Sequence, residues 1–340
     1  MTSPMSIFLG KSIFPPARQH SRRSGILKDS EDYFLKCWPF KTEAARQHFS
    51  RSILADFTAK TIPDTEHWER LVLTGRATTW AFLIDDMIEV DVLYKSMPNL
   101  LQVISGNKKP DSNLYWEVIT DDIWRSIQQS CTALEFDQIT RALKEWYISH
   151  GRPLPENFDG WLIHKVHNSA ANWTWSLTRY AMECRLTDEE LAYPVVREAE
   201  DNASVICFLV NDIVSLAKDK TANFEEENGV SMIQKYGLVS TEEEAMAEIS
   251  NIIVRSSRKL MESTKQALAD PTLSSEVKRW MTALPYAVSG NSWWSQISGR
   301  YNFPGIPALR MTINIEGEGE KVVYPVRILG TLQPQSDLYE

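Results

Sequence analysis

The amino-acid sequence predicts an all-α fold, from its few glycines and from the spacing of its apolar residues. The 340 residues include only 14 glycines, and none lies between Gly25 and Gly75 or between Gly160 and Gly229. Glycine is unfavourable inside helices, whereas sheet-rich enzymes need it at tight turns and nucleotide-binding enzymes need it in phosphate loops. Apolar and charged residues also recur at a spacing of three to four, which indicates amphipathic helices. One compact helical domain is the simplest organisation.

The helical pattern begins near residue 42 and continues through stretches that turn signals separate. Pro153 and Pro155 interrupt it, and Thr187 or Asp188 is a candidate N-cap of the short segment that follows. The expected helical stretches cover residues 42–60, 67–97, 112–150, 159–182, 193–218, 241–269 and 274–297.

The two ends of the chain differ from this helical centre. Residues 1–30 contain prolines and five basic residues, so we expect a mobile basic N-terminal arm or an unstructured leader. Residues 31–305 form the expected helical domain. Residues 306–340 form a C-terminal extension in which β-branched residues alternate around a Gly-Glu-Gly-Glu turn. This pattern predicts a short β-hairpin, with an irregular tail as the alternative.

Composition argues against several classes of protein. The net charge is −9, so no nucleic-acid partner is expected, because phosphate neutralisation supplies most of that affinity. The longest uncharged stretch, residues 282–299, contains proline and many polar residues, so no membrane insertion is expected. Four dispersed cysteines and an N-terminus without a signal-peptide pattern predict free thiols in a cytoplasmic protein. The 12 tryptophans indicate a large aromatic core or cavity.

A first acidic cluster follows the apolar aromatic run at residues 80–83. Asp85 and Glu89 are four residues apart, about 400° of helical rotation, so they share one helix face, and Asp86 lies about 100° away. Carboxylates at this spacing can bind a hard cation such as Mg²⁺. The alternative interpretation is the solvated acidic end of an amphipathic helix.

A second polar cluster follows an apolar run at residues 203–210. Asn211, Ser215 and Asp219 succeed one another at intervals of four and therefore lie on one helix face. Their amide, hydroxyl and carboxylate oxygens are hard ligands, and Lys218 can meet a phosphate oxygen as a point charge. The alternative is a helix C-terminus that emerges into solvent.

A third segment, residues 290–301, ends in an Arg-Tyr pair. Arg300 can bind a phosphate through two N–H groups, and Tyr301 can donate its hydroxyl. Trp293 and Trp294 offer π-faces, which stabilise a desolvated cation by about 2 kcal/mol. The alternative is a tryptophan-rich core helix that ends in surface residues.

Together the three segments resemble the motifs of class I terpene cyclases, particularly fungal and bacterial sesquiterpene synthases. The family's DDxx(D/E) motif matches residues 85–89, and its NDxxSxx(K/R)(D/E) motif matches residues 211–219 without a gap. The terminal Arg-Tyr pair in its Gly-Asn context matches residues 290–301. The resemblance covers roughly residues 40–305 and leaves both ends of the chain unexplained.

Lys165 departs from the family pattern. It stands 46 positions before Asn211, where the family usually carries an arginine that senses the diphosphate. Lysine can pair with a phosphate but lacks the two-pronged geometry of arginine. Arg179 or Arg185 is therefore an alternative sensor.

The linker and effector positions of the family, which follow the sensor, are Asn168 and Ser169 in this sequence. His164 and His167 lie nearby and are three residues apart. Because no further ligand stands at metal spacing, we interpret both histidines as polar residues at a helix break.

The resemblance implies a helical bundle around a deep apolar cavity, in which Mg²⁺-dependent ionisation starts the cyclisation of a linear prenyl diphosphate. Farnesyl diphosphate is the expected substrate, and a sesquiterpene hydrocarbon of humulene type and diphosphate are the expected products. Three Mg²⁺ ions are expected, and a homodimer is common in the family. A chain-elongating prenyltransferase and a non-catalytic helical scaffold are the alternatives.

The resemblance also implies a role for each motif residue. The catalytic residues would be Asp85, Asn211, Ser215, Asp219, Arg300 and Tyr301. The metal ligands would be Asp85, Asp86, Glu89, Asn211, Ser215 and Asp219. The diphosphate would be bound by Lys165, Lys218, Arg300 and Tyr301. The substrate cavity would be lined by Trp80, Phe82, Asn168, Phe208, Trp293 and Trp294.

Overall fold

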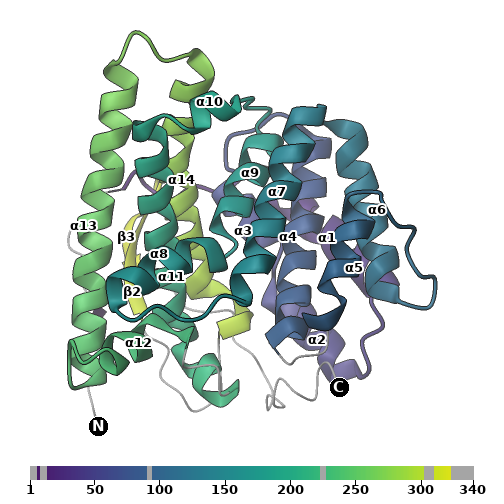
Figure 1. The fold of residues 1–340 in the computed structure, drawn as a ribbon, viewed down its shortest axis with the longest axis horizontal. Coiled ribbons are helices and arrows are strands. Elements are labelled where there is room, and N and C mark those ends of the chain that lie inside the picture. The colour runs from purple at the N-terminus through teal and green to yellow at the C-terminus, as the bar shows by residue number, and fades with distance from the viewer. Residues whose placement is uncertain (1–5, 8–13, 90–93, 223–226, 302–309, 323–340) are drawn as a thin grey trace.

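The computed structural model describes residues 6–7, 14–89, 94–222, 227–301 and 310–322, and most of these residues are helical (Figure 1). The predicted all-α class is therefore confirmed. The longer helices are α1 (Arg23–Cys37), α2 (Glu43–Ser52), α4 (Trp68–Glu89), α6 (Tyr115–Ser130), α7 (Ala133–His150), α8 (Phe158–Asn168), α9 (Ala171–Ala181), α11 (Pro194–Ala222), α13 (Glu242–Ala269) and α14 (Ser275–Ile297). The shorter helices are α3 (Asp56–Thr61), α5 (Met97–Ile104), α10 (Asp188–Leu191), α12 (Gly229–Lys235) and the 3₁₀ turns η1 (Tyr94–Ser96) and η3 (Gly299–Tyr301).

The helices pack around two main apolar clusters. One cluster is formed by α8 and α11 to α14, and the other is formed mainly by α1, α4, α5, α6, α7 and α9. In Figure 1, α11, α13 and α14 stand on one side and α1, α4, α5 and α6 stand on the other. Several tryptophans are fully buried in these clusters, which accounts for the unusual tryptophan content. Burial of such large apolar side chains is the main source of stability for a helical bundle.

Helix ends follow the capping signals in the sequence. The side chains of Thr187 and Thr241 close capping boxes with Glu190 and Glu244, and Ser274 caps α14 by accepting from the amide of Val277. The predicted helices near residues 241–269 and 274–297 are therefore confirmed, within a residue or two at each end.

The long helical stretches predicted in the first half are each divided. The stretch 112–150 splits into α6 and α7, because Thr132 begins a new capping box with Glu135. The stretch predicted as one helix over residues 159–182 is α8 and α9, because Ala170 adopts a left-handed backbone with φ of 58°. Periodicity cannot detect such a break, since the apolar pattern continues across it.

The prediction of a mobile N-terminal arm is wrong for the part of the arm that the structure describes. Helix α1 already begins at Arg23, and the guanidinium of Arg23 donates from Nη2 to Asp56 Oδ2 at 3.0 Å. Arg18 pairs with Asp64 at 2.6 Å and lies over the ring of Tyr286. These two basic residues are therefore bound to acidic and aromatic groups of the helical domain. The remainder of the predicted arm, residues 1–5 and 8–13, lies outside the described residues.

The C-terminal extension forms the predicted hairpin. Strand β2 (Arg310–Ile315) pairs antiparallel with β3 (Gly319–Val322), with Ile315 opposite Gly319. Gly317 in the turn has a φ of 76°, which explains the glycine at this position. Strand β1 (Ser6–Ile7) adds to β2 in parallel, and Ala17 bridges to Ile315. The predicted boundary at residue 306 falls in a segment that is not described.

All four cysteines are free thiols, as predicted. Among the described helices, none is both long enough and apolar enough to span a lipid bilayer.

Candidate active site

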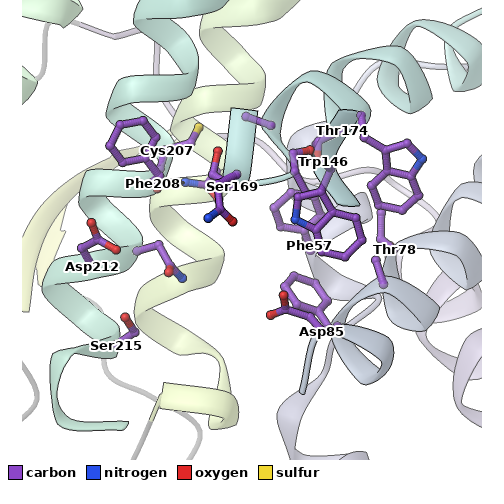
Figure 2. A pocket seen from close by; sticks show the side chains of 18 of the residues that line it. Phe57, Thr78, Asp85, Trp146, Ser169, Thr174, Cys207, Phe208, Asp212 and Ser215 are labelled. Atoms are coloured by element: carbon purple, nitrogen blue, oxygen red, sulfur yellow. Dashed lines mark hydrogen bonds between the residues drawn. The ribbon is translucent and has the colours of Figure 1, made fainter. Parts of the chain in front are cut away.

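A cavity of about 370 Å³ lies between the two halves of the bundle, with α4 on one side and α11 on the other (Figure 2). Helices α3, α7, α8, α9 and α14 and the turn η3 also contribute side chains to its wall. The apolar part of the wall is mainly aromatic. Its rings belong to Phe57, Phe82, Trp146, Trp173, Trp175, Phe208 and Trp294.

Polar residues from all three sequence motifs line the same cavity. Figure 2 shows Asp85 on one side of the cavity and Asp212 and Ser215 on α11 opposite it. The structure thus brings together residues that are up to 216 positions apart in the chain. The predicted polar site residues that line the cavity are Asp85, Lys165, Asn168, Asn211, Ser215, Lys218, Asp219, Arg300 and Tyr301.

The second motif presents three oxygen-bearing side chains on one face of α11. Ser215 Oγ donates to Asp219 Oδ2 at 2.7 Å, and Asn228 Nδ2 donates to the same oxygen at 2.8 Å. Asn211 uses its Nδ2 to donate to the Tyr301 hydroxyl at 2.8 Å. An amide nitrogen engaged in this way leaves the amide oxygen as the group that can bind a cation.

The donor set of this motif fits a hard divalent cation. Within the described residues no group of three or more His, Cys, Asp or Glu side chains could hold a metal ion. On α11 the neutral oxygens of Asn211 and Ser215 lie on the same face as the carboxylate of Asp219 and line the same cavity. Such mixed oxygen ligands suit Mg²⁺, which keeps several waters and binds few carboxylates.

The two neighbouring aspartates of the first motif have different surroundings. Asp85 lines the cavity, whereas Asp86 is buried and is not part of the cavity wall. The Asp86 carboxylate accepts from Arg300 Nη1 at 2.6 Å and lies 3.5 Å from Lys218 Nζ. The 100° step along α4 turns Asp86 toward these two cations and away from the cavity, and its role as a metal ligand stays a prediction. Glu89 ends α4, and its side chain is outside the part of the chain that the structure describes.

Arg300 and Tyr301 form the turn η3 directly after α14. The guanidinium of Arg300 contacts both aspartates of the first motif, with Nη2 lying 3.4 Å from Asp85 Oδ2. Burial by itself lowers the pKa of Arg300, but Asp86, Tyr301 and Asp85 raise it well above its ordinary value. Burial raises the pKa of Tyr301, which keeps its hydroxyl protonated and able to donate.

Lys165 is the cation that α8 contributes to the cavity. Its Nζ donates to the backbone carbonyl of Glu227 at 3.0 Å. Burial opposes its charge, yet the carboxylates of Asp212, Glu227 and Asp219 raise its pKa above the ordinary lysine value. Lys165 is therefore held charged by the acidic groups around it.

Neither of the two alternative arginine sensors reaches the cavity wall. Arg179 is buried and pairs with Glu200, while Arg185 pairs with Glu183 at the surface. Among these three candidates, only Lys165 lines the cavity.

Asn168, the last residue of α8, and Ser169, which follows it, contribute to the cavity wall. Asn168 Nδ2 lies 3.4 Å from Nε2 of His164, so the interpretation of His164 as a polar residue at a helix break is consistent with its surroundings. His167 lies 3.7 Å from Glu145, away from this pair.

Asp212 is a cavity residue that the motif analysis did not single out, although it is the second letter of the matched motif. Its Oδ2 accepts from the backbone N–H of Gly229 at 2.9 Å. Burial raises the pKa of Asp212 to about 7, against the opposing effect of Lys165.

Two tryptophans predicted to line the cavity do not line it. Trp80 is fully buried behind the wall, where its Nε1 donates to Thr120 Oγ1 at 2.7 Å. Trp293 lies under Lys60, whose Nζ is 4.1 Å from the ring centre, and packs against the C-terminal hairpin. Neighbouring helical residues point about 100° apart, so Trp293 and Trp294 face different surroundings.

Four aromatic wall residues were not predicted. They are Phe57, Trp146, Trp173 and Trp175, which come from α3, α7 and α9. No motif marks these helices, and the only signal in the sequence is the high tryptophan count. Which tryptophans face the cavity depends on how the helices pack.

Comparison with known proteins places these observations in a family. The family model described as "Terpene synthase family 2, C-terminal metal binding" matches residues 76–259, which is more than half of the chain. The chain belongs to this terpene synthase family. It is a class I terpene synthase that acts on prenyl diphosphates with the help of a divalent metal, so the predicted enzyme class is confirmed.

Relatives of this terpene synthase include fungal and bacterial enzymes. It is 26% identical to aristolochene synthase from Aspergillus terreus over 296 residues, covering 82% of this chain and 89% of that protein. It is 23% identical to 10-epi-cubebol synthase from Sorangium cellulosum, over 86% of this chain and 96% of that protein. The crystal structure of aristolochene synthase from Penicillium roqueforti has the same fold, with a TM-score of 0.70 at 21% identity over 86% of this chain and 99% of that one.

Proposed function

We propose that this terpene synthase ionises and cyclises farnesyl diphosphate in a Mg²⁺-dependent reaction, giving a sesquiterpene hydrocarbon and diphosphate. One observation carries the proposal: acidic and cationic side chains from all three motifs line the same cavity as a set of aromatic rings. Such a site can bind a charged diphosphate and a long apolar chain at the same time.

The metal would be held by oxygen ligands on two opposing helices. Asp85, with Glu89, is proposed to hold two Mg²⁺ ions, and Asn211, Ser215 and Asp219 are proposed to hold a third. Bound Mg²⁺ supplies Lewis acidity, which neutralises the charge of the departing diphosphate.

Four donors are proposed to bind the diphosphate. Lys165 approaches from α8, Lys218 from α11, and Arg300 and Tyr301 from η3. Positive charge and N–H or O–H donors on several sides stabilise the negative charge that develops as the carbon–oxygen bond breaks. Lys165 would bind the diphosphate as a point charge, where the family usually has an arginine that binds through two N–H groups.

The aromatic wall is proposed to hold the carbocation. Phe82 and Trp294 stack with ring centres 4.9 Å apart, and Phe57 meets both rings edge-on. Aromatic faces attract a desolvated cation, at about 2 kcal/mol per good contact. The same rings exclude water, which would otherwise capture the cation.

The chain length of the substrate is proposed from the relatives, which include aristolochene, 10-epi-cubebol and nerolidol synthases. A humulene-type product and a homodimeric assembly remain predictions from the sequence. Product analysis and sedimentation velocity test them.

The deciding experiment incubates the protein with geranyl, farnesyl and geranylgeranyl diphosphates, each with Mg²⁺, and identifies volatile products by mass spectrometry. We expect cyclic C15 products from farnesyl diphosphate, and none when Mg²⁺ is removed by chelation. A matched control adds isopentenyl diphosphate to each incubation. Longer prenyl diphosphates in that control, without cyclic products, would instead identify a chain-elongating prenyltransferase.

A further inference from the structure

Arg300 lines two cavities at once. Besides the large cavity, it lines a small one of about 20 Å³ together with His48 and Ser52 of α2 and with Asp86. The rest of the small cavity is apolar and is formed by Phe40, Ala45, Phe49, Leu54 and Leu83. A polar cavity needs roughly 10–15 Å³ to hold one water molecule. The small cavity therefore has room for one water beside a guanidinium, a carboxylate and an imidazole.

Two residues that line this cavity each carry a buried nitrogen that lacks a hydrogen-bond partner among the described residues. These nitrogens are Nδ1 of His48 and Nε of Arg300. The other two nitrogens of the guanidinium are engaged, since Nη1 donates to Asp86 and Nη2 lies 3.4 Å from Asp85. A buried polar atom without a partner is unfavourable, and one water can satisfy both nitrogens by accepting from Nε and donating to Nδ1.

The last turn of α2 already supports the turn that carries Arg300. Ser298 Oγ donates to the carbonyl of Ser52 at 2.8 Å, and Trp294 Nε1 donates to the carbonyl of Ile53 at 3.2 Å. Gly299 approaches so closely that an added Cβ would lie 2.5 Å from the carbonyl oxygen of Arg51. The backbone of η3 is therefore fixed against α2, which leaves the Arg300 side chain as the part that still needs positioning.

We propose that the small cavity binds one water molecule that links His48 Nδ1 to Arg300 Nε, and that His48 is thereby a positioning residue for Arg300. With Nε held by the water and Nη1 held by Asp86, the guanidinium keeps one orientation at the edge of the large cavity. The inference rests on the proposed function, because it assumes that Arg300 binds the diphosphate.

The test measures the Kd of inorganic diphosphate by calorimetry in excess Mg²⁺ for a set of variants. His48→Leu removes both ring nitrogens. His48→Asn places a polar atom near the position of Nδ1, whereas His48→Gln places one near Nε2 instead. We expect Leu and Gln to weaken binding about tenfold, the effect of losing one charge-assisted hydrogen bond. We expect Asn to remain close to wild type.

Two controls separate this inference from the proposed function. Arg300→Met should weaken binding more than any His48 variant, and His67→Leu, which changes a half-exposed histidine paired with Glu183, should bind like wild type. If Arg300→Met binds normally, Arg300 is not a diphosphate ligand, and both the proposed role and this inference fail.

Three further results would overturn the inference alone. Normal binding by the Leu and Gln variants would show that His48 does not position Arg300. Equal weakening by Leu, Gln and Asn would show that His48 only fills space. The comparison of Asn with Gln remains decisive even if His48→Leu fails to fold. A crystal structure of the wild type with a water between Nδ1 and Nε would support the proposal directly, and a dry cavity would refute the bridging water.

Discussion

Gly290 is the position where the structure makes its sharpest stability prediction. In α14 this glycine lies against the backbone of α3, and an added Cβ would stand 2.0 Å from the carbonyl oxygen of Lys60. Ordinary contact begins at 3.4 Å, so Gly290→Ala must push α14 and α3 apart by about 1.4 Å. A side chain could rotate away from the added Cβ, but backbone atoms cannot. The two helices must therefore move apart as rigid bodies.

The expected loss of stability follows from two opposing effects. Overpacking of this kind costs about 1–3 kcal/mol and occasionally more. Replacing a helical glycine with alanine returns about 1 kcal/mol. If the clash costs about 3 kcal/mol, the net loss in the free energy of unfolding is about 2 kcal/mol, which lowers Tm by roughly 3 °C in a chain of this length. The product profile should also change, because α3 carries Phe57 and α14 carries Trp294, which meet at 5.3 Å in the cavity wall.

Thermal and urea unfolding measure the stability, and mass spectrometry of volatile products measures the profile. Gly75→Ala in α4 is the matched control, because its added Cβ would meet only the side chain of Ile26, at 3.0 Å, and that of Ala55, at 4.0 Å. We expect the control to change Tm by no more than about 1 °C. The reasoning is refuted if Gly290→Ala unfolds at or above the wild-type temperature, or if it loses no more stability than the control.

Other substitutions test the site. Asp85→Ala and Asn211→Ala should each reduce turnover by at least about a hundredfold and leave the Tm of the ligand-free protein unchanged. Each variant should also lose the rise in Tm that Mg²⁺ with diphosphate gives the wild type. Near-normal turnover in saturating Mg²⁺ would refute the ligand assignment. Trp294→Leu should change the product mixture, whereas Trp293→Leu should lower Tm and leave the mixture unchanged, and the opposite pattern in product analysis would contradict the cavity wall. Lys165→Met should raise the KM for farnesyl diphosphate about tenfold, the loss of one charged contact; an unchanged KM would remove Lys165 from the diphosphate site.

The motif residues of the candidate site could be chosen from the sequence because helical spacing fixes which side chains share a face. Asn211, Ser215 and Asp219 repeat every four residues, and the structure presents all three to one cavity. Trp80 and Trp293 were chosen only because they lie near motifs, and the structure turns both away. Proximity along a helix does not give direction, since each residue adds a 100° rotation.

Helix ends were predictable where a polar cap marks them and unpredictable where the backbone turns without one. Ser274 and Thr241 mark the starts of α14 and α13 through local hydrogen bonds. Ala170 breaks the predicted helix with a left-handed backbone, and the sequence does not mark the residue at which this happens. The two ends of the chain differ in the same way. The glycines of the hairpin turn predict that turn from local sequence. The contacts of Arg18 and Arg23 depend on partners far along the chain, such as Asp64 and Asp56.

The sequence by itself determined the fold class, the order of the motifs and the chemistry of each, because helix periodicity and ligand type are local properties. Only the tertiary structure decided that Asp85 faces the cavity while Asp86 faces Arg300 and Lys218. It also decided which aromatic rings form the wall, since that wall combines helices far apart in the chain. The physical reason is that a cavity belongs to the packing of several helices, and no single segment encodes the packing by itself.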